Sequence, residues 1–227
     1  MKTFLNKKLV GTITMLVVFS ILVSSCKKDD TPELIVYGDA SIRAVNTVSG
    51  SSAQDFYQGT SKLSTTAVAY GEASAYLKIK AGNSTISFKN TTTATSTATQ
   101  NIGAETNNSY TAFYLTSASG SGQIIGFQDD TTAPSSGKAK VRFVNVGSAF
   151  NNNLNINITG GAALTSGLQY SYASVYNTID ATVTLSVQVI GSTAVAIPTV
   201  FQSGKIYTIW FDATSSTSAN AHVIVQN

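Results

Sequence analysis

The chain has 227 residues, of which 43% are hydrophobic and 11% are charged, against a typical charged share of about 25%. Its formal net charge of +3 comes from three lysines near the start, because the other eleven basic residues balance the eleven acidic ones. One His and one Cys leave little material for metal or acid–base chemistry, and a neutral remainder lacks the basic surface that nucleic acids require. We therefore expect no cofactor, no metal site and no nucleic-acid partner.

The chain begins with the features of a lipoprotein signal peptide. Lysines in the first eight residues precede an uncharged apolar run over residues 9–23, which is shorter than the roughly 20 apolar residues of a membrane span. The run ends in Val23, Ser24, Ser25 and Cys26, a pattern that resembles the bacterial lipobox, although that motif usually has Leu where Val23 stands. The resemblance implies that residues 1–25 are removed and that Cys26 is lipidated.

Lipidation at Cys26 implies a membrane anchor of two or three acyl chains, since a single chain binds a bilayer only marginally. The modification consumes the only cysteine, so no disulfide can form within the chain. An ordinary cleaved leader and an uncleaved anchor helix are the alternatives.

The residues directly after the cysteine suggest a destination. Lys27, Lys28, Asp29 and Asp30 resemble the export signal of Bacteroidetes-type lipoproteins. The resemblance implies an outer-membrane lipoprotein that faces the cell exterior, with residues 26–38 as a lipidated tether. A charged, solvated tether without an export role is the alternative.

The rest of the chain has the pattern of an all-β protein. Short runs rich in Val, Ile, Thr, Tyr and Phe alternate with clusters of Gly, Asn and Ser, and no helical periodicity is present. Twelve strands are predicted, over residues 41–46, 55–58, 75–80, 85–89, 109–116, 123–128, 140–146, 154–158, 174–179, 183–190, 206–212 and 222–226. The polar run over residues 90–99 is too poor in apolar residues for a core and is predicted to be a solvated edge or loop.

The two halves of this region resemble each other. Residues 40–46 align with 139–145, residues 70–76 with 170–176, and residues 109–113 with 206–210, at offsets of 99, 100 and 97. About 100 residues with six or seven strands suit a β-sandwich. We therefore predict two tandem Ig-like antiparallel β-sandwiches, over residues 39–128 and 139–227, joined by a linker over residues 129–138.

Several of these segments resemble a bacterial family, the domain of unknown function 4397. The segments are Arg-x-Val-Asn at residues 43–46 and 142–145, Asp-Phe-Tyr-Gln-Gly at 55–59, Tyr-Leu-Lys-Ile-Lys-Ala-Gly at 76–82, and Gly-x-x-Tyr-Thr at 204–208. The resemblance covers residues 39–227 and implies a β-sandwich in a secreted or lipid-anchored protein. The family often has His-Ala-Ser-Pro after its first strand, where this chain has Asn-Thr-Val-Ser, so no role for that histidine transfers.

Few residues suggest catalysis. A Ser–His–Asp arrangement would need His222, the only histidine, near a chain terminus and without a Gly-x-Ser-x-Gly elbow. A glycosidase would need two carboxylates held about 5 to 10 Å apart, and no spacing shows that Asp55, Glu72, Asp180 and Asp212 meet. Asp129 and Asp130 are predicted to lie in a solvated linker, with the start of a calcium site as the alternative.

Four features remain as candidates for binding or modification. Arg43 and Arg142 recur in the repeat and, by period-two alternation, share faces with Val45 and Val144; each is expected to cap a sheet edge or to pair with a carboxylate. Tyr172 lacks an aromatic counterpart in the first repeat, which makes it a candidate ligand contact. The set Asp130-Thr131-Thr132 resembles a Bacteroidetes O-glycosylation site, with Thr131 as the acceptor.

Together these features predict a non-enzymatic, surface-exposed lipoprotein that acts as a binding or adhesion module. Its expected partners are the membrane, through Cys26, and a glycan or an envelope protein. A structural spacer or coat component of the cell envelope is one alternative, and a carboxylate-dependent glycoside hydrolase is another.

Overall fold

The computed structural model describes residues 38–117 and 119–227, and this region is all-β, as predicted. The leader, Cys26 and the charged residues 27–30 lie outside the described residues. The described residues form one compact unit. Within the described part of the chain, no helix is long and apolar enough to cross a membrane.

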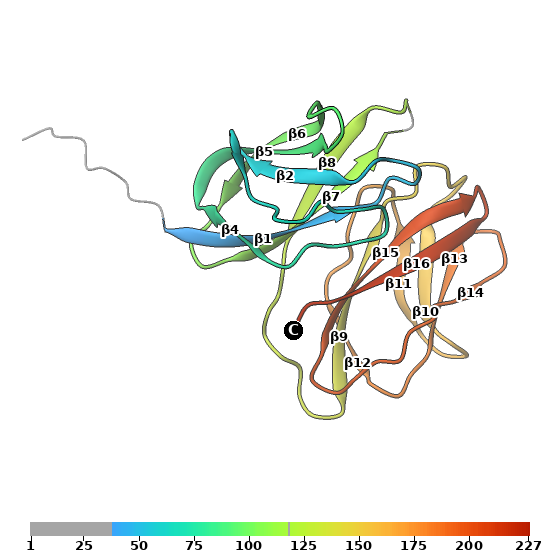
Figure 1. Cartoon of the computed structure of the whole chain (residues 1–227). Coiled ribbons are helices and arrows are strands. Elements are labelled where there is room, and N and C mark those ends of the chain that lie inside the picture. The colour runs from blue at the N-terminus through green and yellow to red at the C-terminus, as the bar shows by residue number, and fades with distance from the viewer. Residues whose placement is uncertain (1–37, 118) are drawn as a thin grey trace, which may run out of the picture. The chain divides into compact units, whose positions relative to one another are not determined.

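The first repeat is a sandwich of two four-stranded sheets (Figure 1). Its strands are β1 (Asp39–Asn46), β2 (Gln54–Gln58), β3 (Ser61–Lys62), β4 (Leu77–Lys80), β5 (Gly82–Asn90), β6 (Ser96–Ala104), β7 (Ser109–Thr116) and β8 (Gly122–Gln128). The β1 sheet has the order β4-β1-β7-β8, and the β2 sheet has the order β3-β2-β5-β6.

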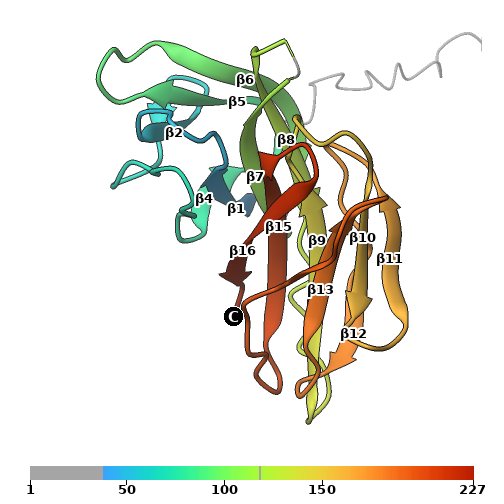
Figure 2. The ribbon, with the colours of Figure 1, turned by 90° about the vertical axis from the view of Figure 1, so that its right-hand side faces the viewer.

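The second repeat has the same eight strands in the same order, drawn in yellow to red in Figure 2. They are β9 (Lys138–Asn145), β10 (Leu154–Ile158), β11 (Ala163–Leu168), β12 (Asn177–Asp180), β13 (Leu185–Val189), β14 (Val195–Ala196), β15 (Ile206–Ser215) and β16 (Ser218–Val225). The β9 sheet runs β12-β9-β15-β16, and the β10 sheet runs β11-β10-β13-β14. The prediction of two tandem sandwiches is confirmed.

One strand pair in each repeat differs from the predicted antiparallel arrangement. Strand β1 pairs with β7 in parallel, and β9 pairs with β15 in parallel. Parallel neighbours need a long crossover, and here the chain passes through the other sheet of its sandwich between the two strands. All other pairs are antiparallel.

The twelve predicted strands are present, and four strands were not predicted: β3, β6, β11 and β14. Strands β3 and β14 have only two residues, which leaves no alternation to detect. Strand β6 begins inside the polar run over residues 90–99 and is an edge strand, which agrees with the solvated edge that the run predicted. Its regularity comes from pairing with β5 rather than from its own side chains.

Alternation along each strand divides the apolar residues among three cores. In β1, Ile42 and Ala44 point into the first sandwich, whereas Val45 points to the opposite face. That opposite face is buried as well, against the outer face of the β9 sheet. The resulting inter-repeat core contains Val45, Phe113 and Leu115 from the first repeat and Val144, Val146 and Trp210 from the second.

The family-like motifs have structural roles in both repeats. The side-chain amides of Asn46 and Asn145 are buried and donate to the carbonyls of Val68 and Leu168, at 3.2 and 3.0 Å. The hydroxyl of Tyr207, in Gly-x-x-Tyr-Thr, accepts from the backbone N–H of Gln202 at 2.8 Å. This is the geometry of a tyrosine corner, which fixes the turn before a central strand of an Ig-like sandwich.

Candidate functional site

The residues singled out from the sequence lie in separate places. Tyr172, the candidate ligand contact, is 60% exposed in the loop between β11 and β12. Thr131 is also exposed, between β8 and β9. Cys26 lies outside the described residues. No described residue connects Tyr172 with Thr131 into one site.

Of the four acidic residues considered for hydrolysis, two form separate ion pairs. Asp55 pairs with Lys62 at 2.8 Å, and Asp180 pairs with Lys138 at 2.7 Å. Glu72 is exposed and lies in the loop before β4. Among the described residues, no group of three or more His, Cys, Asp and Glu side chains is arranged to hold a metal ion.

His222 is packed between the repeats rather than at a terminus that frays. Its ring lies flat on Trp210, with centroids 3.6 Å apart, and its Nε2 lies 3.2 Å from Asp212. The Tyr70 hydroxyl of the first repeat donates to the other oxygen of Asp212. Burial alone would raise the pKa of Asp212, but hydrogen bonds from His222 and Tyr70 outweigh it and lower that pKa below its usual range. The cluster therefore holds the repeats together through a carboxylate that stays ionised.

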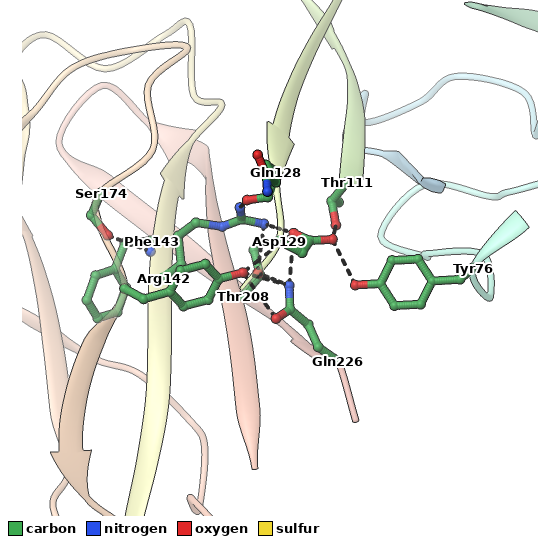
Figure 3. Close-up of polar contacts among 10 residues, drawn as sticks. Tyr76, Thr111, Gln128, Asp129, Arg142, Phe143, Ser174, Thr208 and Gln226 are labelled. Atoms are coloured by element: carbon green, nitrogen blue, oxygen red, sulfur yellow. Dashed lines mark hydrogen bonds and ion pairs between the residues drawn. The ribbon is translucent and has the colours of Figure 1, made fainter. Parts of the chain in front are cut away.

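The prediction of a solvated linker is wrong for Asp129. Its side chain is fully buried and pairs with the guanidinium of Arg142 at 2.6 Å (Figure 3). Its other oxygen accepts from Thr111 at 2.7 Å and from Tyr76 at 2.8 Å. The chain leaves β8 at the place where Asp129 supplies the counter-charge of the buried Arg142.

The two repeat arginines have different surroundings. Arg142 pairs with a carboxylate, as expected, and its guanidinium carbon lies 4.9 Å from the centre of the Tyr176 ring. Arg43 pairs with no carboxylate of the described residues and lies 4.2 Å from the centre of the Tyr76 ring. Both arginines are on central strands, so neither caps a sheet edge. Burial, followed by the negative charge of Asp129, raises the pKa of Tyr76.

These contacts form a closed structural network, because the oxygens of Asp129 are occupied by protein donors. An open concave feature lies elsewhere, between the two sheets of the first repeat. It is a slot of about 350 Å³ beside β6 and β8. Apolar side chains dominate its lining, which includes Ile42, Ile86, Ile102, Ala104, Ala112 and Ile124.

The slot exists because small or polar residues stand where the second repeat has large apolar ones. Tyr110 and Tyr207 make equivalent hydrogen bonds in their repeats. Aligning the repeats on these bonds places Ala104 at the position that corresponds to Phe201. Strand registers likewise place Gly126 opposite Val223. Phe201 is buried against Tyr207, with ring centroids 5.1 Å apart, so the same space in the second repeat is filled.

Two further positions support this comparison and one opposes it. Gln100 corresponds to the buried Ile197, and Ala112 corresponds to the buried Ile209. The size difference is reversed at Ile124, which corresponds to the smaller Ala221. Ile124 therefore fills part of the space in the first repeat. The net result is that only the first repeat leaves its core accessible at this edge.

The two edge strands meet at one end of the slot and separate at the other. A Cβ on Gly122 of β8 would lie 2.0 Å from the carbonyl oxygen of Thr97 in β6, so the backbones touch there. At Gly126, on the same face of β8, the nearest atom to such a Cβ is 3.9 Å away. The slot therefore opens toward residues 100–104, which we call the β6 edge.

The β6 edge also borders a polar groove on the outer face of the β2 sheet. Asn83, Ser84, Thr85 and Asn101 line this groove, and the Thr85 hydroxyl donates to the Asn101 side chain at 2.8 Å. The β6 edge thus has an apolar slot on one side and amide and hydroxyl groups on the other. Such a combination of apolar lining and a few polar groups is typical of ligand sites.

None of the residues singled out from the sequence lies at this site. The available signal was the repeat itself, because aligning the tyrosine corners shows Ala104 against Phe201 and Gly126 against Val223. The significance of those differences depends on knowing that the four positions lie at the same edge of their sandwiches.

Comparisons with known proteins give a family match for part of the chain but no function. Residues 40–152 match the family described as Domain of unknown function (DUF4397), which confirms the predicted resemblance over the first repeat and β9. No curated protein matches the chain. Among solved structures, it is similar to the family 26 carbohydrate-binding module of Eubacterium rectale Amy13K, in complex with maltoheptaose, at 12% identity over 82% of this chain and 96% of that one. The TM-score is 0.25, too low for the likeness to bear on fold or ligand.

Proposed function

We propose that the chain, whose residues 40–152 match the family described as Domain of unknown function (DUF4397), is a non-enzymatic binding module of the cell surface. A lipid on Cys26 holds it to the outer membrane, facing the exterior. Its ligand, a glycan or an envelope protein, binds at the β6 edge. The observation that carries this proposal is the slot that is open in the first repeat and filled in the second.

The chemistry of the slot supports binding rather than catalysis. Its lining is mainly aliphatic, and the Tyr110 hydroxyl is already engaged with the backbone N–H of Glu105 at 3.0 Å. An apolar group of a ligand that enters the slot would be removed from water, at about 25 cal/mol per Å² of buried apolar area. The neighbouring amides would orient its polar groups.

A double substitution that fills the slot tests the proposal. In Ala104→Phe/Gly126→Val, each new residue is the one that the second repeat already holds at the matching position. The full-length protein in detergent micelles is applied to a glycan array and to immobilised outer-membrane proteins. We expect the wild-type protein to bind and the double variant to lose binding.

Tyr172→Ala is the matched control, since it removes the exposed aromatic residue that the sequence suggested. Retained binding in the control places the site at the β6 edge. Loss in Tyr172→Ala with retention in the double variant would move the site to the second repeat. No binding by the wild-type protein to either set of ligands would contradict the proposed function.

The anchor needs its own test. Mass spectrometry of the mature protein should find Cys26 as the first residue, carrying acyl groups, and Cys26→Ala should release the protein from the membrane fraction. Protease added to intact cells should cleave the wild-type protein if it faces the exterior. An unmodified Cys26 thiol in mature protein would contradict the anchor.

A spacer or coat role is the second candidate, and the inter-repeat core favours it. Six residues from both repeats are buried together there, which suits a component that keeps its two halves in a constant arrangement. A spacer does not need an open slot. The filled-slot variant should therefore behave as wild type if the spacer role is correct.

A further inference from the structure

We propose that the ligand of the β6 edge is an extended, uncharged polypeptide segment, which pairs with β6 as an additional strand and inserts an apolar side chain into the slot. This inference rests on the proposed function, because it names the ligand class of the same site. Strand addition at a free sheet edge is a common mode of peptide recognition, in which backbone bonds supply affinity and side-chain pockets supply specificity.

Strand β6 lies at the end of its sheet, next to β5 alone. It has nine residues, Ser96–Ala104, with no proline and no charged residue. Natural proteins usually protect an edge strand of this length with lysine, proline, a bulge or a short strand, because free backbone groups attract other chains. Its C-terminal half has none of these protections.

Some other edges of the described chain are protected. Strand β4 carries Lys78 and Lys80, and β3 has only two residues. The matching strand of the second repeat, β14, also has two residues and is followed closely by Pro198. The same edge strand is thus too short to pair with another chain in the second repeat, whereas it is available for pairing in the first.

One backbone group shows which side of β6 is free. The carbonyl of Asn101 accepts a hydrogen bond from the side chain of its neighbour Gln100, at 3.1 Å. Residues of a strand direct their backbone groups to alternate sides, so Thr99, Asn101 and Gly103 present N–H and C=O groups to the free edge. A partner strand would replace the Gln100 amide at Asn101 and bond to the groups on either side.

The slot could hold a side chain of the added strand while the backbone of that strand pairs with β6. Gln100, Ile102 and Ala104 face the interior of the sandwich, where the slot opens between β6 and β8. Every second side chain of an added strand would face the same way. A single apolar side chain there would take the space that Phe201 fills in the second repeat.

The surroundings favour a polypeptide over a glycan. Glycan sites commonly stack sugar rings on exposed aromatic side chains, and the large exposed aromatic residue of the described chain, Tyr172, belongs to the second repeat. The residues beside the edge, Asn83, Ser84 and Thr85, carry no charge, which suits an uncharged strand.

The experiment uses a phage-displayed library of random nonapeptides, selected against the full-length protein in detergent micelles. Selected peptides are synthesised, and their Kd values are measured by fluorescence polarisation. We expect peptides with apolar residues at alternate positions, and we expect Ala104→Phe/Gly126→Val to weaken their binding at least about tenfold. Tyr172→Ala should leave the Kd unchanged.

Backbone pairing is tested separately from the slot. Asn101→Pro removes an N–H that points to the free edge and leaves the pairing with β5, a position where proline is tolerated. N-methylation of alternate amides of the peptide gives the same test without altering the protein. Each change removes one or two hydrogen bonds and should weaken binding about tenfold.

The outcomes separate this inference from the proposed function. A glycan whose binding is lost in Ala104→Phe/Gly126→Val would overturn the peptide ligand and leave the binding function standing. Kd values that are unchanged by both Asn101→Pro and N-methylation would also overturn strand addition. If the protein forms a dimer that Asn101→Pro dissociates, the edge binds a second copy of the chain. That result would also overturn the peptide ligand. Absence of any binding to peptides, glycans or outer-membrane proteins would overturn both proposals.

Discussion

At the scale of single residues, the two repeats differ at one pair of equivalent positions. Asp129 stands in the first repeat where Gln226 stands in the second. Asp129 accepts from Thr111, and Gln226 donates to Thr208, the matching threonine of the second repeat, at 3.0 Å. Only Asp129 is charged, so only one of the two buried arginines obtains a carboxylate. Gln226 also donates to Asp129, at 3.1 Å, and thereby closes the network between the repeats.

We predict that Asp129→Asn lowers the free energy of unfolding by about 3 to 5 kcal/mol, because it leaves the buried guanidinium of Arg142 without its counter-charge. Urea unfolding monitored by circular dichroism measures the change. Asp130→Asn is the control, since the Asp130–Lys140 pair is partly exposed and should be worth about 1 kcal/mol or less. Equal effects of the two substitutions would contradict the role of Asp129.

Tyr70 makes stability depend on pH in the alkaline range. Burial, followed by its hydrogen bond to Asp212, raises the pKa of Tyr70 to about 12 from 10.0. The folded state therefore holds this proton more tightly than the unfolded state, so the stabilisation is complete below pH 10 and is lost as the pH rises toward 12.

Tyr70→Phe should consequently show a shallower loss of stability between pH 10 and 12 than the wild-type protein, measured as urea midpoints at each pH. Tyr172→Phe, which alters an exposed tyrosine, should keep the wild-type slope. A Tyr70→Phe slope equal to that of the wild-type protein would show that this hydroxyl does not carry the dependence.

At the scale of elements, β8 shows how two glycines on one face of a strand have opposite consequences. Gly122 touches the backbone of β6, whereas Gly126 lies beside the slot. The difference arises from the divergence of the two edge strands, which meet at Thr97 and separate toward Ala104. A glycine is required where backbones touch, and it leaves empty space where they do not.

We expect Gly126→Val to leave stability unchanged or to raise it by about 0.5 to 2 kcal/mol, because the side chain fills space in the slot. Gly122→Val should lower stability by about 1 to 3 kcal/mol, since its Cβ would overlap the Thr97 carbonyl. Thermal unfolding of the two variants side by side provides the measurement. A destabilised Gly126→Val protein would indicate that the slot is closed in solution.

At the scale of the whole molecule, the two repeats share a third core. Trp210 is fully buried there, stacked on His222, and the Tyr170 hydroxyl of the second repeat donates to the Thr116 carbonyl of the first at 2.8 Å. Neither repeat can expose this face without losing apolar burial. We therefore expect the repeats to unfold together, as a single cooperative unit.

Trp210→Ala should cost about 3 to 5 kcal/mol and should split the single calorimetric transition into two, because it empties the core that couples the repeats. Leu154→Ala is the control: it removes a buried side chain from the second repeat's own core and should lower stability without splitting the transition. Two transitions already present in the wild-type protein would contradict the coupling.

The sequence by itself determined the fold class, the repeat and most of the strands, because these follow from local alternation and from similarity between segments about 100 residues apart. It also predicted that Arg43 and Val45 share a face, since a strand has a period of two. It did not reveal what covers that face. Residues 43–46 and 142–145 read as two independent motifs until the chain brings them to one interface.

Only the tertiary structure decided that Asp129 is buried and that the first repeat has an open slot. Both depend on residues distant in sequence: Asp129 on Arg142, Tyr76 and Thr111, and the slot on the separation of β6 from β8. An aspartate in a turn-rich segment reads as solvated because burial is a property of its surroundings. An alanine in place of a phenylalanine becomes a cavity only where the neighbouring strands fail to close over it.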